Sequence, residues 1–210
     1  MESGSVALGY GKEFPEEHEH HGPPPANQSS RVDAQFLGML LFIISEIMLF
    51  GAFFTAYFFV RVAAGHDWFP FEGFQLPVGI ALVNTFILVS SSFTMHWALE
   101  SAKRENRFGL RAGMLLTFLL GLTFLIVQVN EYVHVGFSIS DHAQGTVFYG
   151  LTGLHGAHVF IGLNLLLFST IRAFRGHFTK DEHRGIEVPG IYWHFVDVMW
   201  IIVFSSVYLL

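Results

Sequence analysis

Long apolar stretches alternate with short polar ones along the chain. Five stretches are apolar enough, and long enough, to cross a membrane as helices; they cover residues 34–60, 75–99, 112–130, 142–171 and 188–210. A helix rises ~1.5 Å per residue and the hydrocarbon core of a bilayer is ~30 Å thick, so about twenty residues complete one crossing. We therefore predict an all-α integral membrane protein built as a bundle of five transmembrane helices.

Composition supports this class and also indicates a polar amino-terminal tail. Apolar residues make up 52% of the chain and charged residues only 13%, which excludes an ordinary soluble domain. Residues 1–33 have no apolar core and carry a Gly-Pro-Pro-Pro run and a Glu/His cluster. We expect a disordered tail there rather than a cleaved signal peptide, and one membrane domain over residues 34–210. Cysteine is absent, so disulfides and thiolate metal sites are excluded.

The basic residues predict which side of the membrane each connection occupies. Apart from Arg61, every Lys and Arg falls in the tail or in the second or fourth connection: Lys12, Arg31, Lys103, Arg104, Arg107, Arg111, Arg172, Arg175, Lys180 and Arg184. Cytoplasmic connections retain Lys and Arg. The sequence thus predicts a cytoplasmic amino terminus and, after an odd number of spans, an external carboxyl terminus.

Glu46 is the only ionisable residue in the first span, about halfway along it. A carboxylic acid in the middle of a membrane costs ~2.5 to 3.5 kcal/mol, so such a residue normally faces protein or water and often marks function. It borders a stripe of small residues, Gly38, Ser45 and Ala52, of the kind that lets a neighbouring helix approach closely. We expect the Glu46 carboxyl to point into a helix interface.

The fourth and fifth spans supply candidate partners for this acid. At 100° per residue, His155, His158 and Gly162 fall on one face of the fourth span, at about the depth of Glu46. The other face is predicted to be a packing surface and carries Gly150, Gly153, Ala157 and Asn164. In the fifth span, Asp197 lies one turn from His194. The predicted buried ionisable cluster is Glu46, His155, His158, His194 and Asp197.

Four interpretations of this cluster remain open from the pattern. The side chains could hold the bundle together as interhelical hydrogen bonds, ligate a metal or haem, form an ion or proton path, or serve the chemistry of a neighbouring chain. A di-iron site would need several Glu and a Glu-x-x-His repeat within the spans, and a self-contained transporter is expected to show internal repeats; the five predicted spans have neither. The pattern does not separate the first interpretation from the fourth.

A second polar group lies at the predicted external end of the third span. Four polar residues lie there within seven positions of the chain: Gln128, Asn130, Glu131 and His134. Polar side chains at this depth are typical of the membrane interface. We interpret Glu131 and His134 as part of an interfacial polar cap.

Several blocks resemble subunit III of the haem-copper terminal oxidases, especially the cytochrome c oxidases. They occur in that family's order and spacing and comprise residues 38–50 (GMLLFIISEIMLF), 131–132 (EY), 152–159 (TGLHGAHV), 177–179 (HFT) and 192–200 (YWHFVDVMW). Larger members of the family have seven spans. The chain looks like the five-span bacterial form that lacks the first two.

The resemblance implies a multi-pass accessory subunit of the bacterial plasma membrane. It implies that the chain packs directly on subunit I, near subunit II and a possible small subunit IV, binds phospholipid, supports proton uptake and protects the oxidase during turnover. Haems and copper are expected in the partner subunits, so no catalytic, cofactor or metal residue is expected here. Whether the complex joins a supercomplex with a quinol-oxidising complex stays open from the sequence; nucleic acid is not a partner.

Individual residues match family positions. Glu46 matches the family's buried, carbodiimide-reactive glutamate, and His155 and His158 match its His-x-x-His pair. Arg172 and His177 resemble contacts to lipid headgroups, which suits cations at a cytoplasmic interface.

Three rival assignments stay open beside the cytochrome c branch. The complex could be a quinol oxidase or related to nitric oxide reductase, or the chain could be an independent membrane haem or metal protein. The Ser45-Glu46 pair favours the cytochrome c branch, because quinol-oxidase relatives more often resemble Ser-Asp at that point.

Overall fold

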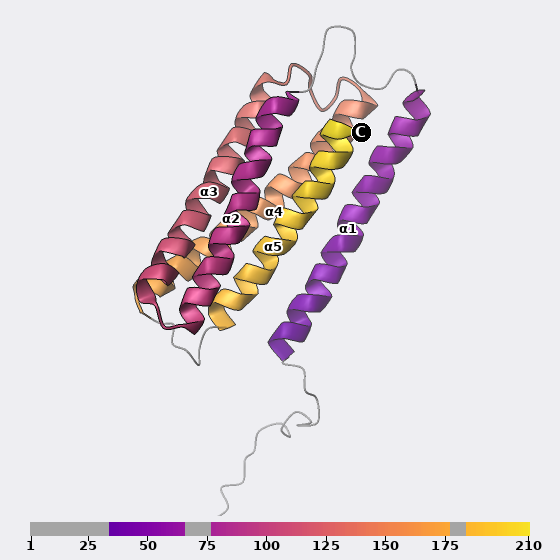
Figure 1. The fold of residues 1–210 in the computed structure, drawn as a ribbon. Helices are drawn as coiled ribbons and strands as arrows, with labels where there is room; N and C mark the ends of the chain where they lie inside the picture. Colours follow the sequence, from indigo (N-terminus) through magenta and orange to yellow (C-terminus); the bar gives the residue numbers. More distant parts are fainter. Residues whose placement is uncertain (1–33, 66–76, 177–183) are drawn as a thin grey trace, which may run out of the picture. The chain divides into compact units, whose positions relative to one another are not determined.

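The structure is a computed structural model that describes residues 34–65, 77–176 and 184–210. Within these ranges the regular structure is helical and contains no strand. It comprises α1 (Ala34–Ala64), α2 (Val78–Lys103), α3 (Arg107–His134), α4 (Ala143–Phe174), α5 (Arg184–Phe204) and a π-helical turn, η2 (Ser205–Leu209) (Figure 1). Five helices are long and apolar enough to cross a membrane, which confirms the predicted fold class. The predicted tail and His177 lie outside the described residues.

The helices extend past the predicted spans because charge marks the edge of the hydrocarbon, not the end of a helix. α3 begins at Arg107, five residues before the predicted span starts, and the Asn106 side chain caps it by accepting a hydrogen bond from the Gly109 N–H at 3.1 Å. α4 ends before Gly176, whose φ of +77° is a left-handed conformation that glycine adopts at little cost.

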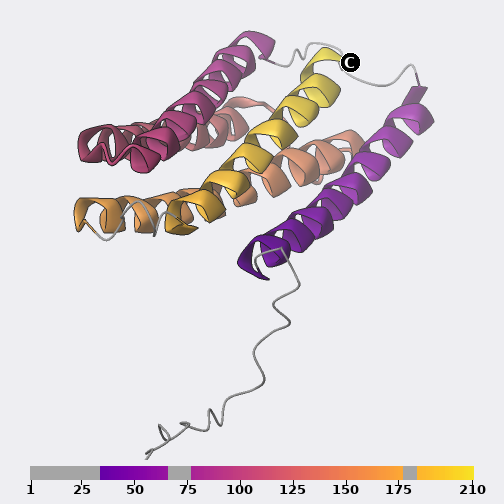
Figure 2. The same ribbon diagram turned by 60° about the horizontal axis from the view of Figure 1, so that its bottom comes forward.

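α5 is the central helix of the membrane domain. It lies between α2 and α4, α2 packs along α3, and α1 lies against α4 and, over a shorter length, α5 (Figures 1 and 2). In the most apolar stretch of each span, 61% of residues are buried in the fifth but only 6% in the first. α1 therefore leaves most of its surface for lipid or for another chain.

The indole of Trp193 fixes how closely α5 approaches its neighbours. A Cβ atom on Gly121 of α3 would lie 2.5 Å from Trp193 Cη2, and one on Gly162 of α4 would lie 2.9 Å from Trp193 Cε3. The indole Nε1–H donates to Ser91 Oγ of α2 at 2.9 Å. Both glycines are needed because a side chain there would occupy the space of the indole.

Two contacts show which connections share an end of the bundle. Arg111, near the start of α3, donates hydrogen bonds to the carbonyls of Ala173 and Phe174 at the end of α4. At the opposite end, Arg61 of α1 donates to the Leu210 carbonyl. The start of α3 and the end of α4 therefore lie at the same end of the bundle, as the charge pattern requires. Which end is cytoplasmic stays a prediction.

The packing faces of two helices differ from those predicted. On α1, Gly38, Ser45 and Ala52 are exposed, and the large residues of another face pack inward instead. On α4 the ionisable face is the buried one, whereas the predicted packing face is exposed at Ala157 and Asn164 and only partly buried at its glycines. Small residues permit a close neighbour, but no described helix covers the stripe on α1, and on α4 Gly150 lies near Phe53 of α1 whereas Ala157 and Asn164 stay exposed.

Candidate functional site

Glu46 lies on the inward face of α1, among large apolar side chains. Met39, Ile43 and Phe50 share this face and pack against the core. Because Phe50 is one turn after Glu46, the same helical phase that buries the ring turns the carboxyl toward α4. Glu46 therefore points into a helix interface, as expected, although not through the small-residue stripe.

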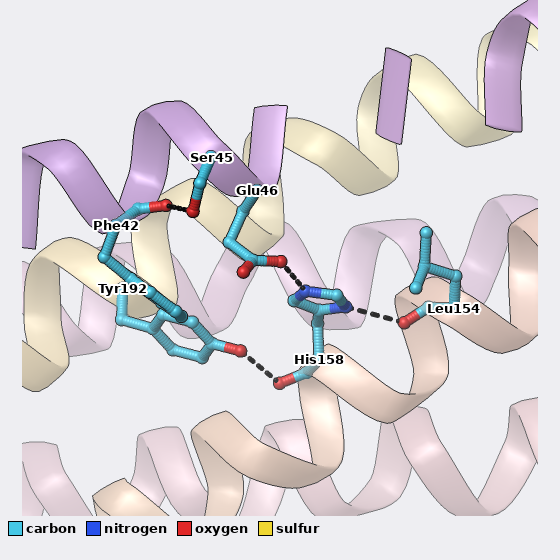
Figure 3. Close-up of polar contacts among 6 residues, drawn as sticks. All are labelled: Phe42, Ser45, Glu46, Leu154, His158 and Tyr192. Carbon is cyan, nitrogen blue, oxygen red and sulfur yellow. Dashed lines mark hydrogen bonds and ion pairs between the residues drawn. The ribbon is translucent and has the colours of Figure 1, made fainter. Parts of the chain in front are cut away.

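Glu46 and His158 are in direct contact between α1 and α4. Glu46 Oε2 lies 2.7 Å from His158 Nε2 (Figure 3). The two side chains are 16% and 8% exposed, respectively. Depth and helical phase offered both His155 and His158 as candidate partners of Glu46, and the structure places His158 against it.

The second ring nitrogen of His158 determines how many protons the pair holds. Nδ1 lies 2.8 Å from the Leu154 carbonyl oxygen, which only accepts, so Nδ1 carries a hydrogen and donates it. One further hydrogen is then shared between Nε2 and Glu46 Oε2. The pair is either a carboxylic acid with a neutral imidazole or a carboxylate with an imidazolium, and both forms have no net charge.

Aromatic side chains surround the pair and limit its contact with water. The Phe50 ring centroid is 4.9 Å from that of His158, and the Tyr192 hydroxyl donates to the His158 carbonyl at 3.3 Å (Figure 3). Ser45 is not a member of the site, because its hydroxyl donates to the Phe42 carbonyl of its own helix at 2.6 Å. In such a low-dielectric setting a hydrogen bond is electrostatically stronger than in water.

His155 is fully buried but faces away from Glu46. Its Nε2–H donates to the Val196 carbonyl of α5 at 3.1 Å, and its ring lies near Phe124 and Trp200, at centroid distances of 5.8 and 4.8 Å. His155 therefore connects α4 to α5 and does not belong to the carboxyl–imidazole pair.

His194 and Asp197 form a third polar contact, directed at α2. His194 Nδ1 lies 2.6 Å from Ser92 Oγ, and the Asp197 carboxyl lies near the same serine. Within the described ranges neither carboxyl oxygen of Asp197 has a partner in hydrogen-bonding geometry. The predicted five-residue cluster is thus three separate sites on different helix interfaces.

The remaining predicted site residues occupy the two ends of the bundle. Glu131 is 5% exposed, so its side chain is buried inside the bundle, where it accepts a hydrogen bond from Tyr208 at 2.7 Å. His134 is exposed at the end of α3. At the other end, the Arg172 guanidinium lies 5.9 Å from the centre of the Phe168 ring.

In the described parts of the chain, no group of three or more His, Asp or Glu side chains is placed to hold a metal ion. Glu46 and His158 alone would provide two ligands. The chemistry that their geometry supports is therefore the transfer of one proton between a carboxyl and an imidazole.

Comparison with known proteins decides the family. The family model described as cytochrome c oxidase subunit III matches residues 17–210. The chain belongs to the cytochrome c oxidase subunit III family. The resemblance inferred from the sequence blocks is thereby confirmed, and so is a multi-pass membrane protein.

Curated relatives agree with this family. The chain is 40% identical over 179 residues to cytochrome c oxidase subunit 3 of Thermostichus vulcanus, covering 85% of this chain and 88% of that protein. It is also 40% identical over 176 residues to the rat protein of the same name, covering 81% of this chain and 67% of the relative. The Drosophila yakuba protein is 40% identical over 180 residues, with the same coverage as the rat protein.

Two parts of the polar architecture have no signal in the sequence. Tyr208 contacts Glu131 across 77 residues of sequence, and no local spacing connects them. Ser92 was only one of several hydroxyls in its span. Its contact with His194 depends on how α2 and α5 are rotated about their axes, which periodicity does not fix.

Proposed function

We propose that this chain is the accessory subunit III of a proton-pumping cytochrome c oxidase in a bacterial plasma membrane. The observation that carries the proposal is the intramembrane Glu46–His158 contact in a chain of this family. Subunit III packs directly on the catalytic subunit I, with subunit II and a small subunit IV nearby. The haems and copper that reduce oxygen to water lie in the partner subunits, so this chain transfers no electrons.

The pair contributes a proton that can move without creating net charge in the membrane. Glu46 and His158 share one hydrogen, and moving it between Oε2 and Nε2 keeps the pair neutral. Glu46 is the more exposed member, and it lies on the helix with the least buried surface. A neighbouring subunit on α1 can therefore approach the carboxyl, which supports proton uptake there and sustained turnover.

Two observations support a cytochrome c oxidase over a quinol oxidase: the identity of residue 46 and the names of the relatives. Glu46 follows Ser45, and the resemblance associates Ser-Glu with that branch and Ser-Asp more often with quinol oxidases. The relatives at 40% identity are cytochrome c oxidase subunits. We therefore propose cytochrome c as the source of electrons for the complex.

The end of α4 supports the proposed contact with phospholipid. Arg172 lies in the last turn of α4, and Phe168, Ile171 and Phe174 around it are exposed apolar side chains. A cation above an apolar helix surface fits the boundary between an anionic headgroup and its acyl chains. Arg172 is the proposed headgroup contact on the cytoplasmic side.

Replacing Glu46 with alanine in the complete complex tests this role. We expect the initial rate of oxygen reduction to be largely retained, while proton uptake slows or the active lifetime during turnover shortens. Oxygen consumption, followed together with proton uptake until activity is lost, measures both effects.

Ser45→Ala is the matched control, because the Ser45 hydroxyl bonds only to its own helix. It is expected to behave as wild type in both rate and lifetime. Immediate loss of haem in Glu46→Ala, or an unchanged lifetime and proton uptake, would contradict the proposed function.

A further inference from the structure

A second buried polar cluster lies between α3, α4 and the carboxyl-terminal turn. The Glu131 cluster consists of Gln128, Glu131 and Tyr132 of α3, Thr152 of α4 and Tyr208 of η2. Tyr208 OH donates to Glu131 Oε1 at 2.7 Å, and the Tyr132 and Tyr208 hydroxyls both lie near the Gln128 amide without meeting hydrogen-bonding geometry with it. Gln128 is 1% exposed and Glu131 5%, so the cluster is shielded from the bilayer.

Four polar atoms of this cluster have no protein partner in hydrogen-bonding geometry. Within the described ranges they are Glu131 Oε2, Tyr132 OH, and the Nε2 and Oε1 atoms of Gln128. A buried polar atom without a partner costs about 1 to 3 kcal/mol, and buried polar groups are almost always satisfied by protein, water or an ion. Four such atoms in one place indicate that the cluster binds a ligand that completes their hydrogen bonds.

A pocket next to the cluster provides a route from outside the bundle. It has a volume of about 250 Å³ and lies between the start of α2 and the end of α3, where Pro77, Asn130, Glu131 and His134 contribute to its lining. Asn130 and His134 are exposed, whereas Glu131 also belongs to the buried cluster. Glu131 thus connects a surface pocket with the four atoms.

The chemistry of the four atoms determines which ligand fits. The Gln128 Nε2 group only donates, Gln128 Oε1 only accepts, and the Tyr132 hydroxyl does both. A metal cation would leave the amide N–H groups unpaired, and an anion would leave the amide oxygen of Gln128 unpaired. A water molecule donates and accepts, and so it can pair with every member.

We propose that the Glu131 cluster is an internal water-binding site that exchanges with external water through the Asn130–His134 pocket. One or two molecules suffice, because a buried water makes about three hydrogen bonds. They bridge Glu131 Oε2, the Gln128 amide and the Tyr132 hydroxyl, while Tyr208 holds the other carboxyl oxygen. This site is independent of the Glu46–His158 pair and of the role proposed for that pair.

A high-resolution cryo-EM map of the membrane complex that co-purifies with the chain tests the site without any mutation. We expect density for ordered water at hydrogen-bonding distance, about 2.6 to 3.2 Å, from both Glu131 Oε2 and the Gln128 amide. Direct hydrogen bonds from Gln128 to Glu131 or Tyr132, with no density between them, would overturn the proposal.

Two amide-to-leucine variants extend the test. Gln128→Leu removes two of the four atoms, so the water density should disappear from its map. Asn164→Leu removes an exposed amide on α4 and should leave that density in place. Unchanged water density in Gln128→Leu would contradict the proposal, and if that variant does not fold, the wild-type map decides.

Discussion

At the scale of single residues, Glu46 is tolerated inside the membrane because His158 completes its hydrogen bonding. A lone acid at mid-membrane costs ~2.5 to 3.5 kcal/mol. Here the carboxyl has an imidazole at 2.7 Å, and the other imidazole nitrogen donates to a carbonyl of its own helix. The pair contributes both a contact between helices and a proton that is shared without net charge.

A double-mutant cycle measures this contact. We expect Glu46→Leu and His158→Leu each to destabilise the folded chain, because each leaves the other polar group buried and unpaired. The coupling energy between them should be about 0.6 to 1.7 kcal/mol, the range for interhelical hydrogen bonds in membranes. Reversible unfolding in mixed micelles gives the four free energies of unfolding.

The control cycle pairs Glu46→Leu with Asn164→Leu on the exposed face of α4. The Asn164 amide donates to the Phe160 carbonyl of its own helix, so the effects of the two substitutions should add within about 0.5 kcal/mol. If the Glu46/His158 cycle were equally additive, the contact would make no net contribution to stability.

At the scale of elements, the position of α5 depends on fitting one indole between two glycines. Gly162→Ala should destabilise the chain by about 1 to 3 kcal/mol, because the new methyl group overlaps Trp193 and overpacking carries a cost of that size. The free energy of unfolding in mixed micelles measures the effect.

Gly153→Ala is the matched control on the same helix. A Cβ there meets nothing within 4 Å, and alanine is favoured over glycine in a helix by about 0.5 to 1 kcal/mol. The control should therefore be neutral or stabilising. A Gly162→Ala variant as stable as Gly153→Ala would show that the indole can move aside at little cost.

Helical periodicity predicted the elements well and their neighbours only in part. The five spans followed from length, whereas depth and phase offered both His155 and His158 as partners for Glu46, of which only His158 contacts it. Phase also showed that α4 has two distinct faces, but it did not show that the ionisable face is the buried one. The separation of His194 and Asp197 from His158, and the burial of Glu131 beside Tyr208, depend on packing between distant segments, which no local pattern encodes.

At the scale of the whole molecule, the charge pattern and the contacts at the helix ends agree on which connections lie together. Arg111 ties the start of α3 to the end of α4, and Arg61 meets the last residue at the opposite end. Retention of Lys and Arg on the cytoplasmic side then predicts an external carboxyl terminus.

Reporter fusions test this orientation. A reporter fused after Leu210 should give an external signal, and one inserted after Glu105, an exposed residue in the connection between α2 and α3, should give a cytoplasmic signal. A cytoplasmic signal from the Leu210 fusion would overturn the charge argument.

The composition of the complex in mild detergent tests the central claim most directly. We predict that the native chain co-purifies with a catalytic subunit that carries haem and copper, and that the separated chain shows no haem spectrum and no stoichiometric metal. Purification of the chain without oxidase subunits, together with its own stoichiometric haem or metal, would contradict its assignment as an accessory subunit.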